Sequence, residues 1–190
     1  MGKLVLGLVG KFGAGKSLVA MHLEKRGFLK ITLSDFLREK AKARGQEPNR
    51  DVLQNLGNEL REKFGIGVLS QLAWERIYQS KVSLAVIDGI RNPGEVEFFR
   101  MKDNFYLLKI EADEEIRFQR LLQNSDPRYP KTWEEFAMTE KRDLGEGEKE
   151  SGQQVGEVLK MADSTIFNEE TEEKLYQKVD DLIVRLTASS

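Results

Sequence analysis

The segment GKFGAGKS, residues 10–17, constrains this chain more than any other part of its sequence. It matches G-x-x-x-x-G-K-[S/T] at every fixed position, and it lies between the apolar run 3–9 and a helical pattern over 16–26. Glycines let successive backbone N–H groups turn toward one anion, and the helix N-terminus adds positive potential. This context of strand, loop and helix predicts a phosphate-binding loop for a nucleoside triphosphate.

Two side chains of this segment carry the predicted chemistry. The Lys16 ammonium suits the β- and γ-phosphates, and the Ser17 hydroxyl suits Mg²⁺, so ATP and Mg²⁺ are the expected cofactors. The predicted nucleotide-binding residues of the loop are Gly10, Lys11, Phe12, Gly13, Ala14, Gly15, Lys16, Ser17 and Leu18. The motif by itself does not distinguish a kinase from an ATPase, a switch or a motor.

The rest of the chain alternates apolar runs with helical patterns. Further strands are expected at 28–33, 81–88, 104–111 and 163–168. Helices are expected at 16–26, 35–44, 50–63, 66–80, 113–123, 133–143 and 170–187, with another opening at Pro93, whereas the polar segment 145–157 is expected to be mobile. Buried strands that alternate with helices form a parallel sheet covered on both faces. The predicted fold is therefore α/β, a three-layer P-loop NTPase fold with a five-stranded parallel sheet.

Composition narrows the classes of partner. The 190 residues suit one domain, and 30 Lys and Arg against 32 Asp and Glu give a net charge of −2, so nucleic acid is not an expected partner. The sequence has no cysteine, which fits a reducing cytoplasm, and no apolar run long enough to span a bilayer. We expect a cytoplasmic monomer or homodimer that acts on a small molecule.

The ends of the predicted strands carry further charged residues. Right-handed crossovers bring the carboxyl ends of parallel strands to one edge of the sheet, so these residues should converge on the phosphate loop. Asp88 ends an apolar strand and is the expected second Mg²⁺ residue, unless the Asp-Gly pair is an ordinary turn. Arg91 is expected to fork onto a second phosphate. The alternative for Arg91 is a surface ion pair with Glu95 or Glu97.

The segment SDFLR, which follows the second predicted strand, places Asp35 and Arg38 on one helical face. Arg38 is expected to bind an acceptor phosphate, while Asp35 orients that phosphate or a water on the metal. Asp35 is also a candidate general base for a hydroxyl acceptor. The two side chains can alternatively pair only with each other.

The phosphate loop, SDFLR and the DGIR after the third predicted strand together resemble P-loop nucleoside monophosphate kinases. Ser34 stands where glycine is usual, and DGIR is one residue shorter than in adenylate kinases. The segments RDVLQNLGNELREKFG and IDGIRNPGEVEFF are closer to two groups, deoxynucleoside monophosphate kinase-like proteins and archaeal-type P-loop kinases similar to dephospho-CoA kinase. The segments DPRYPKTWEEF and LGEG also resemble the second group.

The resemblance implies a single kinase domain over residues 1–190. Its parts would be a core of 1–33, 81–123 and 155–190, an acceptor-binding helical region at 34–80 and a lid at 124–154. Arg61 would be a further acceptor contact, or else a solvated helix residue. Arg120 and Arg128 would act on the transition state from the lid side, with Arg117 on the same helical face as Arg120. Asn168 would contact the adenine, or else only cap the last helix.

The expected reaction is transfer of the γ-phosphoryl group of Mg-ATP to a nucleoside monophosphate, ribo or deoxy. Arg38 and Arg91 favour an acceptor that already carries a phosphate, which needs cationic contacts and alignment but no general base. Two alternatives stay open at this point. One is transfer to a hydroxyl group, as in dephospho-CoA kinase, and the other is a P-loop ATPase or switch without a small acceptor.

Overall fold

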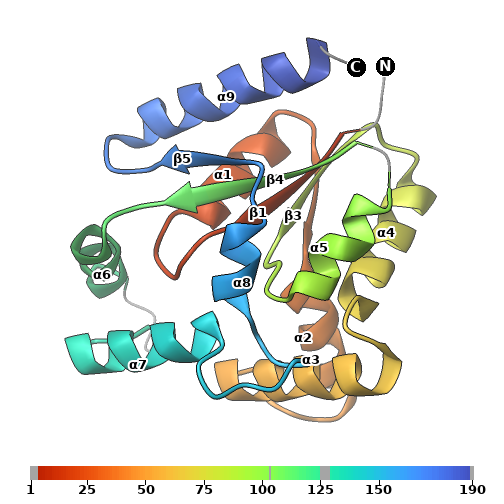
Figure 1. Cartoon of the computed structure of the whole chain (residues 1–190), viewed down its shortest axis with the longest axis vertical. Coiled ribbons are helices and arrows are strands. Elements are labelled where there is room, and N and C mark those ends of the chain that lie inside the picture. The colour runs from red at the N-terminus through yellow and green to blue at the C-terminus, as the bar shows by residue number, and fades with distance from the viewer. Residues whose placement is uncertain (1–3, 103, 125–128, 189–190) are drawn as a thin grey trace.

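The computed structural model describes residues 4–102, 104–124 and 129–188. Its centre is a parallel sheet of five strands in the order β2-β3-β1-β4-β5 (Figure 1). The strands are β1 (Leu4–Val9), β2 (Leu29–Thr32), β3 (Leu84–Asp88), β4 (Phe105–Glu111) and β5 (Ser164–Phe167). The expected α/β fold with a five-stranded parallel sheet is confirmed.

Helices connect the strands and cover the sheet. They are α1 (Lys16–Lys25), α2 (Leu33–Ala43), α3 (Arg50–Phe64), α4 (Val68–Ser80), α5 (Pro93–Arg100), α6 (Glu114–Leu122), α7 (Trp133–Leu144), α8 (Val155–Lys160) and α9 (Glu172–Ala188). Asn92 caps α5 and Thr132 caps α7, each in a capping box, as the sequence indicates. No helix in the described ranges is long and apolar enough to cross a membrane.

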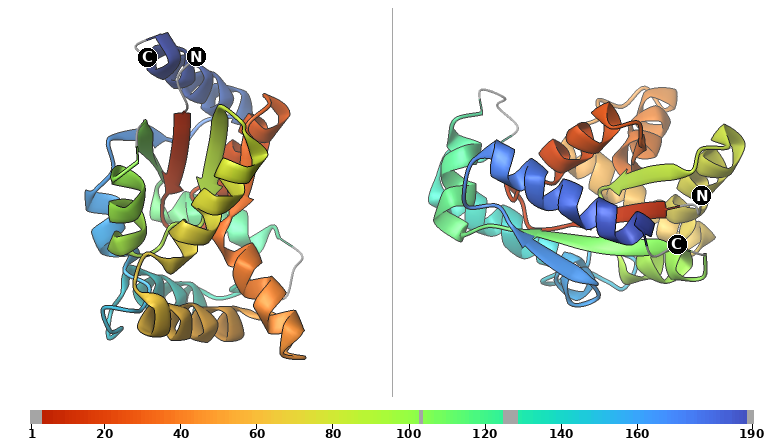
Figure 2. Two further views of the ribbon diagram at one scale, coloured as in Figure 1. Left: turned by 90° about the vertical axis from the view of Figure 1, so that its right-hand side faces the viewer. Right: turned by 90° about the horizontal axis from the view of Figure 1, so that it is seen from above.

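The two faces of the sheet bury separate apolar clusters, which makes the three layers. On β1, Val5 and Val9 belong to the cluster formed with α2, α3, α4, α5 and α8, whereas Leu6 and Leu8 belong to the cluster formed with α1 and α9. All of β1 is buried because it lies in the middle of the sheet with helices on both faces. Figure 2 shows α5 and α1 on opposite sides of the strands.

The segment 145–157 differs from the expectation of a mobile loop. Asn92 donates hydrogen bonds from Nδ2 to the carbonyl oxygens of Glu150 (2.8 Å) and Gly152 (2.9 Å), and α8 begins inside the segment at Val155. The polar composition of the segment does not indicate these hydrogen bonds, because their donor, Asn92, is distant in sequence. The segment therefore connects α7 to the core by defined contacts.

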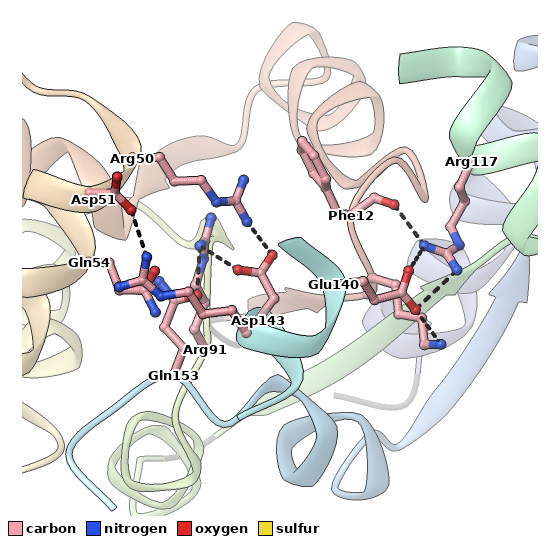
Figure 3. A network of polar contacts seen from close by, with 12 residues as sticks. Phe12, Arg50, Asp51, Gln54, Arg91, Arg117, Glu140, Asp143 and Gln153 are labelled. Atoms are coloured by element: carbon pink, nitrogen blue, oxygen red, sulfur yellow. Dashed lines mark hydrogen bonds and ion pairs between the residues drawn. The ribbon is translucent and has the colours of Figure 1, made fainter. Parts of the chain in front are cut away.

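The carboxyl ends of the strands carry the phosphate loop and the start of α2, and α3 and α7 lie at the same end of the molecule (Figure 1). Side chains at the start of α3 bond to the last turn of α7, across about ninety residues of sequence (Figure 3). The region expected to bind the acceptor and the region expected to form the lid are therefore in contact.

Candidate active site

The phosphate loop is held in a curled conformation that needs glycine. Gly13 and Gly15 have φ angles of 81° and 102°, in the left-handed region that glycine adopts without strain. A Cβ atom at Gly15 would collide with the Asn168 side-chain amide, and one at Gly13 would lie 2.9 Å from the Arg117 carbonyl oxygen. The loop therefore needs glycine for its backbone conformation and for the close approach of its neighbours.

Lys16 folds back over this loop. Its Nζ donates hydrogen bonds to the carbonyl oxygens of Gly10 (2.7 Å) and Lys11 (3.1 Å). Burial lowers the pKa of the Lys16 ammonium to about 8, although the Asp88 carboxylate acts to raise it. A buried ammonium bound to the loop carbonyls lies beside the place that the motif assigns to a triphosphate, whose negative charge would favour the protonated form.

The first residues of α1 and the last residue of β3 bring two oxygen atoms together. The Ser17 hydroxyl donates to Oδ2 of Asp88 at 3.2 Å, and Asp88 is buried at the carboxyl end of its strand. Hydroxyl and carboxylate oxygens are hard ligands of the kind that Mg²⁺ prefers, with phosphate oxygens and water completing the shell. The described residues contain no group of three or more His, Cys, Asp and Glu side chains that could hold a metal.

A cavity opens beside Lys16, between the phosphate loop, the end of β3 and the last turn of α7. Its walls include the charged side chains of Lys16, Arg91, Glu140 and Asp143, together with apolar groups. Arg91 donates from Nη1 to Oε1 of Gln153 at 3.0 Å, and the same nitrogen lies 3.9 Å from Oδ1 of Asp143. The Arg91 guanidinium therefore faces this cavity and does not form the surface ion pairs with Glu95 or Glu97 considered above.

Asp143 contacts a further guanidinium, which comes from helix α3. Arg50 donates from Nη2 to Oδ2 of Asp143 at 2.6 Å, and its guanidinium also lies over the Phe12 ring, 4.8 Å from the ring centre (Figure 3). The other oxygen, Oδ1 of Asp143, is buried and accepts no hydrogen bond. One carboxylate oxygen at the cavity wall is therefore left without a donor.

A second arginine cluster ties α7 to the phosphate loop. Arg117, fully buried on α6, donates to Oε2 of Glu140 at 2.6 Å and to the Phe12 carbonyl oxygen at 3.0 Å. Lys11 pairs with Oε1 of Glu140 at 2.6 Å. Burial would raise the pKa of Glu140, but hydrogen bonds from Arg117 and Lys11 outweigh it and hold that pKa below its usual value. This cluster fixes α7 against the phosphate loop.

Three of the expected acceptor residues lie outside the cavity lining. Asp35 and Arg38 are 51% and 41% exposed and pair weakly with each other at 3.5 Å on α2. Arg61 is buried, and its guanidinium donates from Nη2 to Oε1 of Glu95 at 2.8 Å. Arg61 is thus neither solvated nor open to a ligand here, because a buried carboxylate from α5 already engages it.

Arg120 and Asn168 form a chain of contacts behind the phosphate loop. Arg120 donates from Nη2 to the Asn168 carbonyl oxygen at 2.9 Å, and Asn168 donates from Nδ2 to the Ala14 carbonyl oxygen at 2.9 Å. The Asn168 amide therefore supports the loop instead of capping α9. Arg128, the other predicted lid arginine, lies outside the described residues. The roles assigned to Arg120 and Asn168 stay predictions.

Sequence reasoning missed Arg50, Glu140, Asp143 and Gln153. Glu140 and Asp143 are three residues apart on one face of α7. The capping box at Thr132 marks the start of this helix, so the sequence indicates that the two residues share a face. That spacing indicates a shared face but not what the face contacts. Arg50 and Asp143 are 93 residues apart, and no local pattern connects them.

Comparison of the sequence with known families matches an AAA domain over residues 6–151. Relatives of similar length occur in archaea. A UPF0200 protein of Pyrococcus horikoshii is 30% identical over 191 residues, which cover 98% of this chain and 99% of the relative. A UPF0200 protein of Pyrococcus furiosus is 32% identical over 185 residues, covering 95% of this chain and 96% of the relative.

Solved structures share the fold. TT1252 from Thermus thermophilus superposes with a TM-score of 0.61 at 18% identity, covering 98% of this chain and 99% of that one. Shikimate kinase from Bacteroides thetaiotaomicron superposes with a TM-score of 0.57 at 14% identity, covering 95% and 98%. The fold is therefore that of P-loop kinases, as the sequence motifs indicate.

Proposed function

This chain belongs to the AAA domain family and to the UPF0200 proteins, and from that premise we propose that it transfers the γ-phosphoryl group of Mg-ATP to a nucleoside monophosphate, ribo or deoxy. The observation that carries the proposal is the cavity shared by Lys16 and Arg91. Lys16 belongs to the donor loop, whereas Arg91 follows the neighbouring strand β3. Two cations that come from different elements and line one cavity suit two phosphates that react with each other.

The donor half consists of the loop backbone, Lys16, Ser17 and Asp88. The loop N–H groups and Lys16 bind the triphosphate, while Ser17 and Asp88 hold Mg²⁺, directly or through water. The metal, when bound, neutralises charge on the β- and γ-phosphates. The hydrogen bond between Ser17 and Asp88 supports this assignment, because it places both oxygens beside the first turn of α1.

We assign Arg91 to the acceptor half, together with Arg38 and Asp35 of α2, which lie outside the cavity lining. An oxygen of the acceptor phosphate attacks the γ-phosphorus in line, the bond from that phosphorus to the bridging oxygen breaks, and ADP leaves with the electron pair. The attacking oxygen is already ionised, so the step needs alignment and positive charge and no general base. We assign the alignment to Arg91 and the outer guidance of the acceptor to Arg38.

The proposed function also assigns a role to each region of the chain. Residues 1–33, 81–123 and 155–190 form the core, 34–80 supply the acceptor-binding helices α2, α3 and α4, and 124–154 form the lid with α7. Closure of a lid excludes water from a transferable phosphoryl group. Arg120, in the core range just before the lid, and Arg128, within the lid range, are the candidates for charge stabilisation on that side.

A panel of acceptors tests the proposal. The full chain is incubated with Mg-ATP and each common nucleoside monophosphate, ribo and deoxy, and ADP formation is followed with a coupled assay. We expect turnover that depends on one or a few of these acceptors, with transfer to the acceptor confirmed by chromatography of the product. ADP formation that no acceptor changes would contradict the proposal and leave an ATPase or switch.

A second arm of the panel separates phosphate acceptors from hydroxyl acceptors. Dephospho-CoA and free nucleosides carry the hydroxyl chemistry for which a carboxylate base is needed. If they are the substrates, Asp35→Asn should abolish kcat and leave acceptor binding intact. For a nucleoside monophosphate, the same variant should change kcat only a fewfold, because no proton has to be removed.

A further inference from the structure

Two guanidinium groups from different parts of the chain lie beside the Asp143 carboxylate, and one ammonium group lines the same cavity. Arg50 bonds to Oδ2 at 2.6 Å, and Arg91 lies 3.9 Å from Oδ1 (Figure 3). Lys16 lines the same cavity. They come from α3, from the end of β3 and from the phosphate loop. These elements converge here although nothing local in the sequence joins them.

Only one oxygen of the Asp143 carboxylate is hydrogen-bonded to these cationic groups. Oδ1 is buried and accepts no hydrogen bond, and Arg91 keeps its 3.0 Å hydrogen bond for Gln153. A buried oxygen without a donor is costly, so a closed structural cluster would be expected to satisfy it. Guanidinium groups bind carboxylate and phosphate with the same planar fork, and a phosphate offers more oxygens and more negative charge.

We propose that Asp143 occupies the position of the acceptor's anionic group in this structure, and that Arg50 joins Arg91 in binding that group. The inference rests on the proposed function, and it adds a residue of α3 to the acceptor site. The acceptor phosphate takes the two guanidinium groups from Asp143. The carboxylate of the last turn of α7 is therefore a competitor that sets acceptor affinity, and an acceptor without an anionic group cannot displace it.

The chain contains a matched control for this idea. Asp51 and Arg142, the direct neighbours of Arg50 and Asp143, also pair at 2.6 Å between the same two helices. Their side chains are 74% and 41% exposed, and neither lines the cavity. An effect that comes only from docking α3 on α7 should appear in both pairs, whereas an effect on the anion site should appear only in the inner pair.

The experiment measures anion binding without turnover. The full chain is saturated with Mg²⁺ and a non-hydrolysable ATP analogue, which fills the phosphate loop, and inorganic phosphate is then titrated by calorimetry. The variants are Arg50→Gln, Arg50→Lys, Asp143→Asn and Asp51→Asn, each checked for folding by thermal unfolding. Arg50→Lys keeps the charge but loses the fork, so it distinguishes charge from geometry.

We expect Arg50→Gln to weaken phosphate binding about tenfold or more, the loss expected for one charge-assisted contact. Arg50→Lys should lie between this variant and the wild type. Asp143→Asn should tighten phosphate binding by about threefold to tenfold, because an amide competes less well than a carboxylate for guanidinium groups. Asp51→Asn should bind phosphate like the wild type.

Three outcomes would overturn the inference. Unchanged phosphate binding in Arg50→Gln would remove Arg50 from the site, and weaker binding in Asp143→Asn would make the carboxylate an organiser of the arginines instead of a competitor. Equal losses in Arg50→Gln and Asp51→Asn would also overturn it. The phosphate titration does not depend on phosphoryl transfer. If no acceptor supports activity, the proposed function is wrong, but the titration still tests the inference. If transfer occurs but the titration shows the wrong pattern, only the inference is wrong.

Discussion

The last two turns of α7 contribute carboxylates to two arginine clusters that differ in one respect. Glu140 accepts from Arg117 at 2.6 Å and 3.3 Å, and Lys11 also pairs with it, so both of its oxygens are engaged. Asp143, one turn later, has one oxygen bound to Arg50 and one without a hydrogen-bond donor. The first cluster faces the donor loop, and the second faces the cavity beside it.

The difference separates a structural charge cluster from a candidate binding site. Buried ions that satisfy one another leave nothing for a ligand to gain, and removing one partner mainly damages the fold. Buried ions that are incompletely satisfied gain a partner when a ligand enters, so they are candidates for function. The same helix thus contacts the phosphate loop through the Glu140 cluster and the proposed acceptor site through Asp143.

The largest effect should come from breaking the satisfied cluster. Glu140→Gln leaves the Arg117 guanidinium buried without a full counter-charge, so the free energy of unfolding should fall by about 3 kcal/mol. Urea unfolding at neutral pH measures this loss. Glu134→Gln on the exposed face of α7 is the matched control and should change little. A loss as small as that of the control would mean that the Glu140 cluster is not structural.

The next largest effect should come from replacing Arg91, and it should appear in acceptor binding instead of stability. Arg91→Ala removes a guanidinium that is 36% exposed at the cavity wall, so folding should be nearly unaffected. The acceptor KM should rise about tenfold to a hundredfold, as expected for loss of contacts to a charged group. The KM for ATP should stay within about twofold. Equal increases in both KM values would place Arg91 outside the acceptor half.

Lowering the pH should have a smaller effect on stability, and this effect again involves Glu140. The pKa of Glu140 in the folded protein lies below its ordinary value of 4.5, so its contribution to stability is present above that pH and is lost as the pH falls through the folded pKa. The gap in stability between the wild type and Glu140→Gln should therefore narrow with acid. Unfolding curves at several pH values down to about 3 measure it, and a gap that stays constant or widens would contradict the assignment.

The smallest effect should come from the outer ion pair. Asp51→Asn breaks a contact between exposed side chains, for which a stability change of about 0.5 kcal/mol or less is expected. Added salt should remove even that change. A loss above about 1 kcal/mol that survives high salt would show that docking of α3 on α7 depends on this pair, and the contrast between the inner and outer pairs would weaken.

The sequence predicted where the phosphate loop lies in the fold, because the determinants of that loop are local. The glycine pattern, Lys16 and Ser17 lie within eight residues, and the apolar strand before them fixes their place at the edge of the sheet. The order of strands and helices followed from the alternation of apolar runs. Even Asp88 was identified from its position at a strand end, where it lies within hydrogen-bond distance of Ser17.

The second half of the site could not be read in the same way. The charged face of α7 has the composition of a solvated surface, and only the packing shows that Glu140 and Asp143 are turned inward. Arg61 resembled an acceptor contact in sequence, but Glu95 from the distant helix α5 engages it. Pairing across such separations depends on tertiary structure, and one sequence does not contain that information.

The crossed pairing at the ends of α3 and α7 has a consequence for evolution. Both helix ends carry the dipeptide Arg-Asp, Arg50-Asp51 on one and Arg142-Asp143 on the other. Exchanging the signs at positions 51 and 142 together would preserve their attraction, whereas changing one alone would place like charges side by side. In an alignment of relatives we therefore expect the outer pair, Asp51 and Arg142, to vary in a correlated way. The inner pair, Arg50 and Asp143, should stay unchanged if it serves the proposed anionic acceptor.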